Sequence, residues 1–580
     1  MTTTLTGRPA APGAALALAF ALAEAPGADQ PLPESRQGDT DTEVARLDAA
    51  LATAGEQLTT LAERVAESAG EDEAEIFEAH AEFAEDPELR GQAVEAIEGG
   101  LSAERAVVAA FGAFRELLAA STSEYHAARA EDLDDVRDRI IALLQGRSVE
   151  VEAPTVRSVV LARELTPSRT ANLPRELIAA LVTETGSPTS HAAILARSLG
   201  IPAVVACDGV LAAVEAAGEG VEVAVDGRSG EVVIAPDERL RDQVALRMQA
   251  EATRRETLEE LRDEPGRTAD GRRVELAANL GDPGDLEAAV AAGAEGSGLV
   301  RTEFLFQDRA DEPSVDDQVG FYLDVLRAFP GQRVVFRTMD IGADKPLAFV
   351  ARDPEENPAL GLRGIRLHLA RPELFRDQLR ALVRAHRAIA SEDAGRLAVM
   401  FPLVAVPSEL LAARNLLAAA AEDEGVSLDG VEVGMMVEVP SAAIGARRFA
   451  EHVDFLSIGT NDLLQYLFAV DRLNGAVADL ADACDPVALG LIGRVIADGH
   501  AGGAWVGICG EAASDPVVAA ALVGLGADEL SMTRVAIPEV KDVLRSLELE
   551  RCRHAVHSAM EEGADGTEVR ALLEEHLGLA

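Results

Sequence analysis

The second half of the chain alternates short apolar segments with helical stretches, and this alternation restricts its fold more than any other feature. Eight apolar segments follow residue 265, each with room for a helix after it. They are residues 274–278, 298–300, 334–336, 397–400, 434–437, 455–458, 505–508 and 528–531. Eight βα units in series predict a closed parallel (β/α)8 barrel, a TIM barrel. A doubly wound open sheet is the alternative, but no Gly-x-Gly-x-x-Gly opening accompanies the units.

The first half of the chain divides into a helical section and an α/β section. Residues 43–144 are rich in Ala, Glu and Leu with helical periodicity, which predicts a helical bundle. Strand-like segments follow at residues 158–161, 203–206, 221–225 and 232–234. The apolar segment 14–23 is interpreted as a buried strand that completes this α/β domain, so the bundle is an insertion in it.

These patterns predict a multidomain α/β chain with five segments. We expect an N-terminal strand (1–24), a helical subdomain (25–146), an α/β domain (147–236), a linker helix (237–265) and the barrel (266–580). Residues 237–262 are charged and contain neither Gly nor Pro, which is typical of one long helix.

Chemically distinctive residues follow the predicted barrel strands. The carboxyl ends of barrel strands form the rim at which such folds carry out chemistry. The rim residues are Arg301, Arg337, Arg363, Arg472, Glu438, Asn461, Asp462 and Cys509. Guanidinium groups bind phosphate and carboxylate oxygens, the two acids supply hard oxygen ligands for Mg²⁺, and a thiol exchanges protons. Each residue alone has a structural explanation, but their number on one rim favours a site for a small phosphate-bearing acid.

A second candidate site lies at residues 186–197, GSPTSHAAILAR. Its Gly, Ser, Pro and Thr are typical of a turn that caps a helix. Free N–H groups and the positive dipole at a helix start favour an anion. His191 is therefore a candidate nucleophile for a phosphoryl group. The alternative is a capping histidine without a chemical role.

Charge and cysteine content limit the classes of partner. The net charge of −48 argues against a nucleic-acid ligand and favours a basic partner. Four cysteines without C-x-x-C spacing predict neither disulfides nor a zinc site, which favours a reducing cytoplasm.

Residues 14–23 also resemble part of a signal peptide, but only Arg8 precedes them as a positive charge. No apolar run reaches the ~20 residues of a membrane helix.

The motifs together resemble the phosphoenolpyruvate–protein phosphotransferase family, enzyme I of the bacterial sugar phosphotransferase system. Residues 165–168 (LTPS) and the His191 motif resemble its phosphohistidine domain. Residues 301–305 (RTEFL), 357–361 (NPALG), 459–463 (GTNDL) and 509–511 (CGE) resemble its barrel motifs, in the same order. Pyruvate phosphate dikinase and phosphoenolpyruvate synthase share the histidine motif. They remain alternatives, as does an inert regulatory protein that binds a phosphocarrier.

The resemblance implies a role for each candidate residue. His191 would accept the phosphoryl group of phosphoenolpyruvate with Thr166 nearby, and Cys509 would protonate the enolate to give pyruvate. Glu438 and Asp462 would hold Mg²⁺. The substrate would be bound by Arg301, Arg337, Arg363, Asn461, Asp462 and Arg472. The phosphoryl group would then pass to a histidine of the carrier protein HPr, the first step of sugar uptake.

The resemblance also assigns roles to the segments. It implies a cytoplasmic homodimer joined through the barrel, a hinge in the linker helix, and an HPr-binding bundle. In that bundle the acidic residues 85–88 (EDPE), with Tyr125 and Arg129, would face the basic surface of HPr. The alternative for the acidic residues is a solvated face. One departure stands out, because residues 186–188 read GSP where many members of the family have GGR.

Overall fold

A computed structural model describes most of the chain and divides it into two compact units, Met1–Arg255 and Glu256–Ala580. The described residues are 2–22, 32–33, 35, 38–68, 71–119, 124–147, 153–188, 190, 193, 196–197, 200–307, 309, 311–341, 349, 355–472, 474 and 476–579. Each unit has hydrophobic cores of its own.

The second unit is built on a closed parallel barrel. Its strands are β9 (Glu275–Leu280), β10 (Gly296–Val300), β11 (Arg333–Arg337), β12 (Arg396–Phe401), β13 (Glu432–Val437), β14 (Phe455–Ile458), β15 (Trp505–Ile508) and β16 (Glu529–Met532). Each strand pairs in parallel with the next, and β16 pairs with β9 to close the ring. The predicted barrel is therefore confirmed, and the open sheet is excluded.

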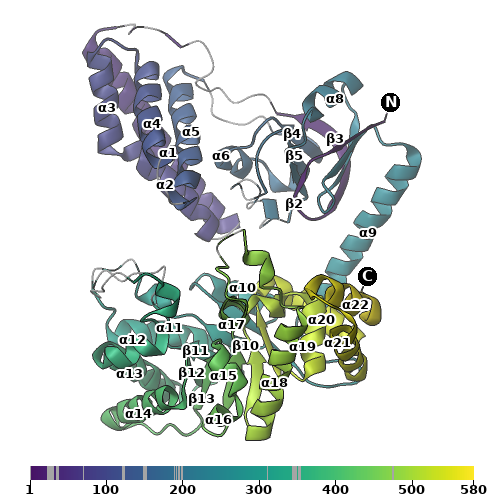
Figure 1. Cartoon of the computed structure of the whole chain (residues 1–580). Coiled ribbons are helices and arrows are strands. Elements are labelled where there is room, and N and C mark those ends of the chain that lie inside the picture. The colour runs from purple at the N-terminus through teal and green to yellow at the C-terminus, as the bar shows by residue number, and fades with distance from the viewer. Residues whose placement is uncertain are drawn as a thin grey trace. The chain divides into compact units, whose positions relative to one another are not determined.

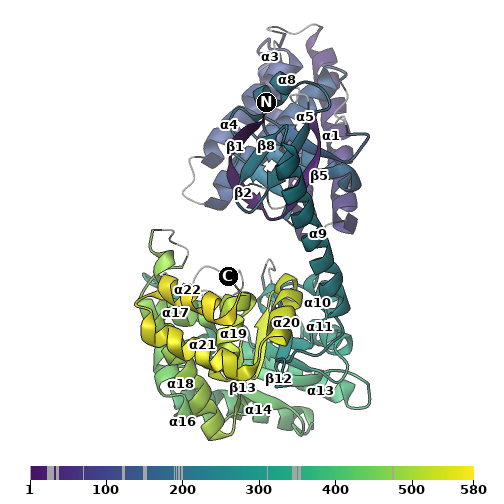
Figure 2. The ribbon, with the colours of Figure 1, turned by 90° about the vertical axis from the view of Figure 1, so that its right-hand side faces the viewer.

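Helices surround the barrel (Figure 1). They are α10 (Asp285–Ala291), α11 (Val315–Ala328), α12 (Gly364–Ala370), α13 (Pro372–Ile389), α14 (Pro407–Glu424), α15 (Pro440–Ile444), α16 (Arg447–Ala450), α17 (Thr460–Phe468), α18 (Pro486–Gly502), α19 (Pro516–Leu525), α20 (Ile537–Ser546), α21 (Leu549–Glu562) and α22 (Gly566–Leu577). Short 3-10 turns are η2 (Glu303–Leu305), η3 (Pro358–Leu360), η4 (Ala478–Leu480), η5 (Glu511–Ser514) and η6 (Arg534–Ala536). Figure 2 shows α19 to α22 side by side on one flank of this unit.

The starts and ends of these helices follow from local sequence. Asp485 and Asp515 each precede a proline, and their carboxylates accept hydrogen bonds from the first free N–H groups of α18 and α19. Gly503 and Gly526 end the same helices with positive φ angles of 91° and 109°, a region that glycine adopts without a steric penalty.

The first unit contains one eight-stranded sheet. Its strands are β1 (Thr3–Thr6), β2 (Arg8–Ala11), β3 (Ala14–Ala21), β4 (Ser158–Ala162), β5 (Ile178–Thr183), β6 (Ala203–Val205), β7 (Glu222–Asp226) and β8 (Glu231–Ile234), in the order β1-β8-β7-β3-β4-β5-β6-β2. Helices α6 (Pro167–Ala171) and α8 (Val210–Ala217) and the turn η1 (Arg175–Leu177) connect strands of this sheet.

The N-terminal segment differs from its prediction in two respects. It supplies three strands instead of one, because β1 and β2 add to opposite edges of the sheet. The strand β3 does complete the domain, pairing with β4 and β7, but it is not fully buried, since Leu18 is 39% exposed. Alanine side chains on β3 fill the covered face, and Ala15 lies in a buried cluster with Val159 and Val225.

A helical bundle is inserted between β3 and β4. It consists of α1 (Thr40–Ser68), α2 (Glu71–Glu85), α3 (Pro87–Glu98), α4 (Ala103–Ala119) and α5 (Glu124–Leu144). Its core includes Leu47, Leu58, Ile97 and Ile140, which confirms the predicted all-helical insertion. The expected linker helix is also present, as α9 (Glu238–Glu260). The exact boundaries of the five segments stay a prediction. Among the described helices, none has the length and apolar character needed to cross a bilayer.

Close packing inside the barrel gives a first prediction. A Cβ atom added at Gly298 in β10 would overlap Oε1 of Glu529 and lie 2.6 Å from Cβ of Ser531. We expect Gly298→Ala to lower the free energy of unfolding by about 1–3 kcal/mol, because the buried neighbours must shift. Urea unfolding followed by circular dichroism measures the change. Gly320→Ala is the matched control, since α11 is exposed there and nothing lies within 4 Å of the added Cβ. Equal losses in both variants would contradict the packing argument.

Candidate functional site

All eight rim residues selected from the sequence line one pocket of about 120 Å³ at the carboxyl ends of the barrel strands. The pocket lining comprises Arg301, Arg337, Arg363, Glu438, Asn461, Asp462, Arg472 and Cys509, together with Leu299, Glu303, Asp340, Met436, Gly459 and Gly510. Most of the lining comes from residues at or just after the last position of a strand, in β10, β11, β13, β14 and β15. Barrel closure therefore brings together residues that lie more than 200 positions apart in sequence.

Two of the four arginines, with side chains only 12% and 11% exposed, are held by carboxylates. Nη2 of Arg337 lies 2.9 Å from Oε1 of Glu303, and Nη1 lies 3.6 Å from Oδ2 of Asp340. Arg363 donates from Nε and Nη2 to both oxygens of Asp340, at 3.2 and 2.7 Å. Burial alone would lower the pKa of both arginines, but these carboxylates raise it above the ordinary value. Both side chains are therefore fixed cations.

The other two arginines, Arg301 and Arg472, have exposed side chains. Neither guanidinium forms an ion pair with any part of the chain that the structure describes. An exposed guanidinium without a partner is available to bind an anion from solution. The pocket thus combines two fixed cations in its wall with two free cations at its opening.

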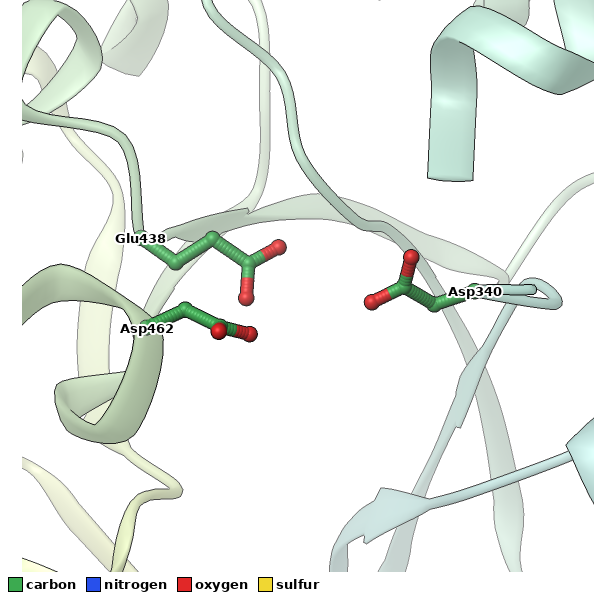
Figure 3. A group of neighbouring side chains, drawn as sticks. All are labelled: Asp340, Glu438 and Asp462. Carbon is green, nitrogen blue, oxygen red and sulfur yellow. The ribbon is translucent and has the colours of Figure 1, made fainter. Parts of the chain in front are cut away.

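Three carboxylates meet in the pocket. Oxygens of Asp340, Glu438 and Asp462 lie within 4.8 Å of one another, and Figure 3 shows Glu438 and Asp462 side by side, facing Asp340. The arginines keep Asp340 ionised and balance its charge. Burial would raise the pKa of Asp340, but the charges of Arg337 and Arg363 lower it. Asp462 makes a weaker contact, with Oδ2 at 3.3 Å from Nη2 of Arg363.

Glu438 is the least compensated of the three acids. It is 1% exposed, and Oε1 accepts a hydrogen bond of 2.6 Å from the backbone N–H of Leu403. Burial, together with the negative charges of Asp462 and Asp340, raises the pKa of Glu438 from its ordinary value of 4.5 to about 8. Carboxylates that repel one another at this distance offer a hard oxygen site for a divalent cation, which would relieve the repulsion.

The thiol of Cys509 completes the pocket on the side of β15. It is 4% exposed, and Sγ lies 3.7 Å from the carbonyl oxygen of Ile458. Burial raises the pKa of Cys509 to about 12, so the group is a protonated thiol at neutral pH. Asn461 is held by a reciprocal pair of hydrogen bonds with Glu511, at 3.0 and 2.8 Å.

Sequence reasoning did not select three residues that organise this site. Glu303 belongs to the quoted RTEFL motif and Asp340 follows Arg337 by three positions, but only the structure shows that they hold Arg337 and Arg363. Asn279 at the end of β9 donates from Nδ2 to the carbonyl oxygen of Cys509, at 3.1 Å. A position at or just after the end of a strand was the available signal, and it does not distinguish a supporting residue from a ligand.

The second candidate site is only partly described. His191 and Thr189 lie outside the described residues. In the remainder of the motif, Arg197 donates from Nη1 to the carbonyl oxygens of Pro188 and Ala10, at 2.8 and 2.6 Å. The hydroxyl of Thr166 is buried and has no hydrogen-bond partner among the described residues. The side chains of Tyr125 and Arg129 also lie outside the described part.

Comparison with known proteins decides between the families considered. Three family descriptions match: "PEP-utilising enzyme, N-terminal" over residues 6–129, "PEP-utilising enzyme, mobile domain" over 155–230, and "PEP-utilising enzyme, PEP-binding domain" over 255–549. A phosphoenolpyruvate-protein phosphotransferase of Geobacillus stearothermophilus is 42% identical over 555 residues, 94% of each chain. The chain belongs to the phosphoenolpyruvate-protein phosphotransferase family.

Two further relatives carry the same name. The protein of Haloferax volcanii is 45% identical over 502 residues, which is 86% of each chain, and that of Latilactobacillus sakei is 39% identical over 590 residues, 99% of each chain. The resemblance stated from the motifs is thus confirmed, and the chain is an enzyme of phosphoenolpyruvate-dependent phosphoryl transfer. The pocket described above lies in the part that matches the PEP-binding domain of this family.

The raised pKa of Glu438 predicts a pH-dependent effect on stability. An acid with a higher pKa in the folded state takes up a proton on folding, so its contribution to stability is lost as pH rises from 4.5 to about 8. Glu438→Gln removes this loss and keeps the acceptor for Leu403. We expect the variant, in a chelator, to resist urea better than the native protein at about pH 9 and about equally at pH ~4.

Glu451→Gln, on an exposed side chain at the end of α16, is the control and should show no pH-dependent difference. If Glu438→Gln were the less stable protein at the alkaline pH, burial of an uncompensated carboxylate would be the wrong description of this site.

Proposed function

We propose that the enzyme transfers the phosphoryl group of phosphoenolpyruvate to His191, releases pyruvate, and passes the group to a histidine of HPr. This is the first step of the sugar phosphotransferase system and serves sugar uptake. One observation carries the proposal: fixed cations, free cations, carboxylates and a protonated thiol converge in one pocket of a phosphoenolpyruvate-protein phosphotransferase family member.

The four arginines and Asn461 are proposed to bind the substrate. Arg337 and Arg363 are already paired with carboxylates in the wall, so they supply a rigid positive surface. Arg301 and Arg472 are free of partners among the described residues and are able to close on the phosphate and carboxylate groups. Preorganised cations of this kind stabilise the charge that is redistributed over the phosphoryl and leaving enolate oxygens during transfer.

Glu438 and Asp462 are proposed to hold Mg²⁺. The donor set fits this ion, because both residues offer hard oxygens and Mg²⁺ needs only one or two carboxylates besides substrate oxygens. Asp340 is the weaker candidate, since both of its oxygens already accept hydrogen bonds from Arg363. When bound, the ion would neutralise charge on the phosphate and enolate oxygens. Asp462 also faces Arg363 and is therefore placed to contribute to substrate binding.

Proton transfer is assigned to Cys509. The bond between phosphorus and the enol oxygen of phosphoenolpyruvate breaks as a bond from phosphorus to a nitrogen of His191 forms. The enolate left behind takes a proton at its methylene carbon from the Cys509 thiol, which gives pyruvate. A thiol with a pKa of about 12, raised by burial, keeps its proton until a strong carbon base is present. Solvent then returns the proton to sulfur.

The helical bundle is the proposed docking surface for HPr. Residues 85, 87 and 88 are exposed at the junction of α2 and α3, and a basic partner would be attracted by the two glutamates. Asp86 has a structural role as well, because its carboxylate caps α3 by accepting from the N–H groups of Glu88 and Leu89. A cytoplasmic location and a homodimer through the barrel belong to the same proposal, and both rest on the family resemblance.

The histidine assignment is tested by labelling. We expect incubation with phosphorus-labelled phosphoenolpyruvate and Mg²⁺ to place acid-labile phosphate on His191, and subsequent addition of HPr to remove it. His191→Ala should take up no label, because a phosphoramidate bond needs the imidazole nitrogen. His557→Ala, at an exposed position of α21, is the matched control and should label normally. Label retained by His191→Ala would refute the assignment.

The proton-donor role gives a separate prediction. Cys509→Ala should lower the rate of pyruvate release by about 10²–10⁴-fold, the usual contribution of a general acid. Cys484→Ala is the matched control, since that thiol is also buried but lies outside the pocket lining. Pyruvate release is followed with a coupled dehydrogenase assay in the presence of HPr. A rate for Cys509→Ala within a few-fold of the control would remove Cys509 from the mechanism.

A further inference from the structure

The short helix α6 touches both parts of the first unit. On one side, the flanking residues Leu165 and Leu173 lie in the core of the sheet domain, in the same cluster as Ala193 and Ala196. On the other side, Ala171 packs against a buried cluster of the helical bundle that contains Leu61, Val65 and Phe77. A movement of the bundle relative to the sheet would therefore have to move α6 or break one of these contacts.

A buried carboxylate strengthens the contact with the bundle. Asp135 of α5 accepts two hydrogen bonds from Ser168 of α6: the N–H donates to Oδ2 at 3.1 Å and the hydroxyl donates to Oδ1 at 2.9 Å. Asp135 is 8% exposed and Ser168 is 3% exposed. Nδ1 of the fully buried His80 lies 3.9 Å from Oδ2 of Asp135. At the other end of α6, Arg64 of α1 donates to Oδ1 of Asn172, at 2.5 Å.

The Asp135–Ser168 contact depends on the exact position of α6, which an apolar contact would not. A carboxylate away from water is stable only while its hydrogen bonds are made, and Ser168 provides both a backbone and a side-chain donor to it. Sliding of α6 along the bundle would leave Asp135 without these partners. The pair therefore selects one position of α6 on the bundle.

The same helix adjoins the segment that carries His191. Leu165 immediately precedes Thr166, and Leu165 shares its core cluster with Ala193, two positions after His191. The buried hydroxyl of Thr166 has no hydrogen-bond partner in the described part of the chain. A shift of α6 relative to the bundle would therefore move Thr166 and Leu165, and with Leu165 a core neighbour of Ala193.

We propose that Asp135 is a positioning residue that couples the helical bundle to the His191 segment through Ser168. The coupling serves the transfer to the carrier, because it fixes the histidine segment relative to the surface on which HPr docks. This inference rests on the function proposed above. The bundle has no proposed role in the step that draws the phosphoryl group from phosphoenolpyruvate in the barrel pocket. We therefore expect loss of the contact to change that step much less than the transfer to HPr.

The experiment separates the two half-reactions in the full-length protein. We compare Asp135→Asn, Ser168→Ala and the double variant with Asp134→Asn as the matched control. Asp134 is the neighbouring acid on α5, is partly exposed, and pairs with Arg115 and Arg137 at the surface. Rapid-quench measurements follow the uptake of label from phosphoenolpyruvate and, separately, the transfer of label from the enzyme to HPr.

We expect Asp135→Asn to transfer its label to HPr about ten-fold more slowly at saturating HPr, with the KM for HPr unchanged. Uptake of label from phosphoenolpyruvate should stay within about two-fold of the native rate. Ser168→Ala should show the same selectivity with a smaller effect, since its backbone N–H still donates. The double variant should be no slower than Asp135→Asn, because one shared contact is lost only once. Asp134→Asn should behave as the native protein does.

A native rate of transfer in both single variants would overturn the proposal, and so would an equal fall in both half-reactions. Amide hydrogen exchange over residues 165–173 provides a readout that is independent of the reaction. Exchange should accelerate in Asp135→Asn and remain native in Asp134→Asn, and equal exchange in the two would also overturn the coupling. If the native enzyme took no label from phosphoenolpyruvate, the proposed function would fail, while the exchange measurement would still decide whether the coupling exists.

Discussion

Two guanidinium groups leave water when the barrel closes, and the rest of the site depends on how their charges are balanced. The side chains of Arg337 and Arg363 are only 12% and 11% exposed in the pocket wall, where an unpaired cation would be unfavourable. Asp340 contacts both of them, and Glu303 supplies a second partner for Arg337. Because these acids are committed to the wall, the neighbouring Glu438 and Asp462 are left to repel each other and to attract a cation.

This distribution of paired and unpaired charges suits the pocket to a charged ligand. It also lowers the folding stability of the protein without ligand. Glu438 is held in a buried position that raises its pKa to about 8, so its ionised form is unfavourable until a cation arrives. Arg301 and Arg472 have no anionic partner in the described chain. A divalent cation would compensate the charge of Glu438, and a phosphate-bearing acid would pair with Arg301 and Arg472. The pocket is thus less stable without ligand, because the ligands supply the opposite charges that the chain lacks there.

The sequence predicted the structure best where burial and the parallel direction of the strands allow few arrangements. Strands buried on both faces appear as short apolar segments, so the barrel and the residues at its strand ends could be predicted together. The strands β1 and β2 were missed because their sequences, TTLT and RPAA, lack an apolar pattern. The roles of Asp340 and Asp135 could not be predicted, since each is one acid among many and the residue that donates hydrogen bonds to it lies more than 20 positions away.

The proposed reaction requires one imidazole to react with two partners, and in each half of the reaction the chain provides a buried carboxylate that accepts hydrogen bonds from fixed donors. In the barrel, Asp340 fixes the arginines that face the donor. In the first unit, Asp135 accepts two hydrogen bonds from Ser168 of α6, the helix that we propose positions the segment of the acceptor. Neither carboxylate needs to touch the transferred group. Both contacts use the same physical principle, in which a desolvated carboxylate permits only one arrangement of its donors.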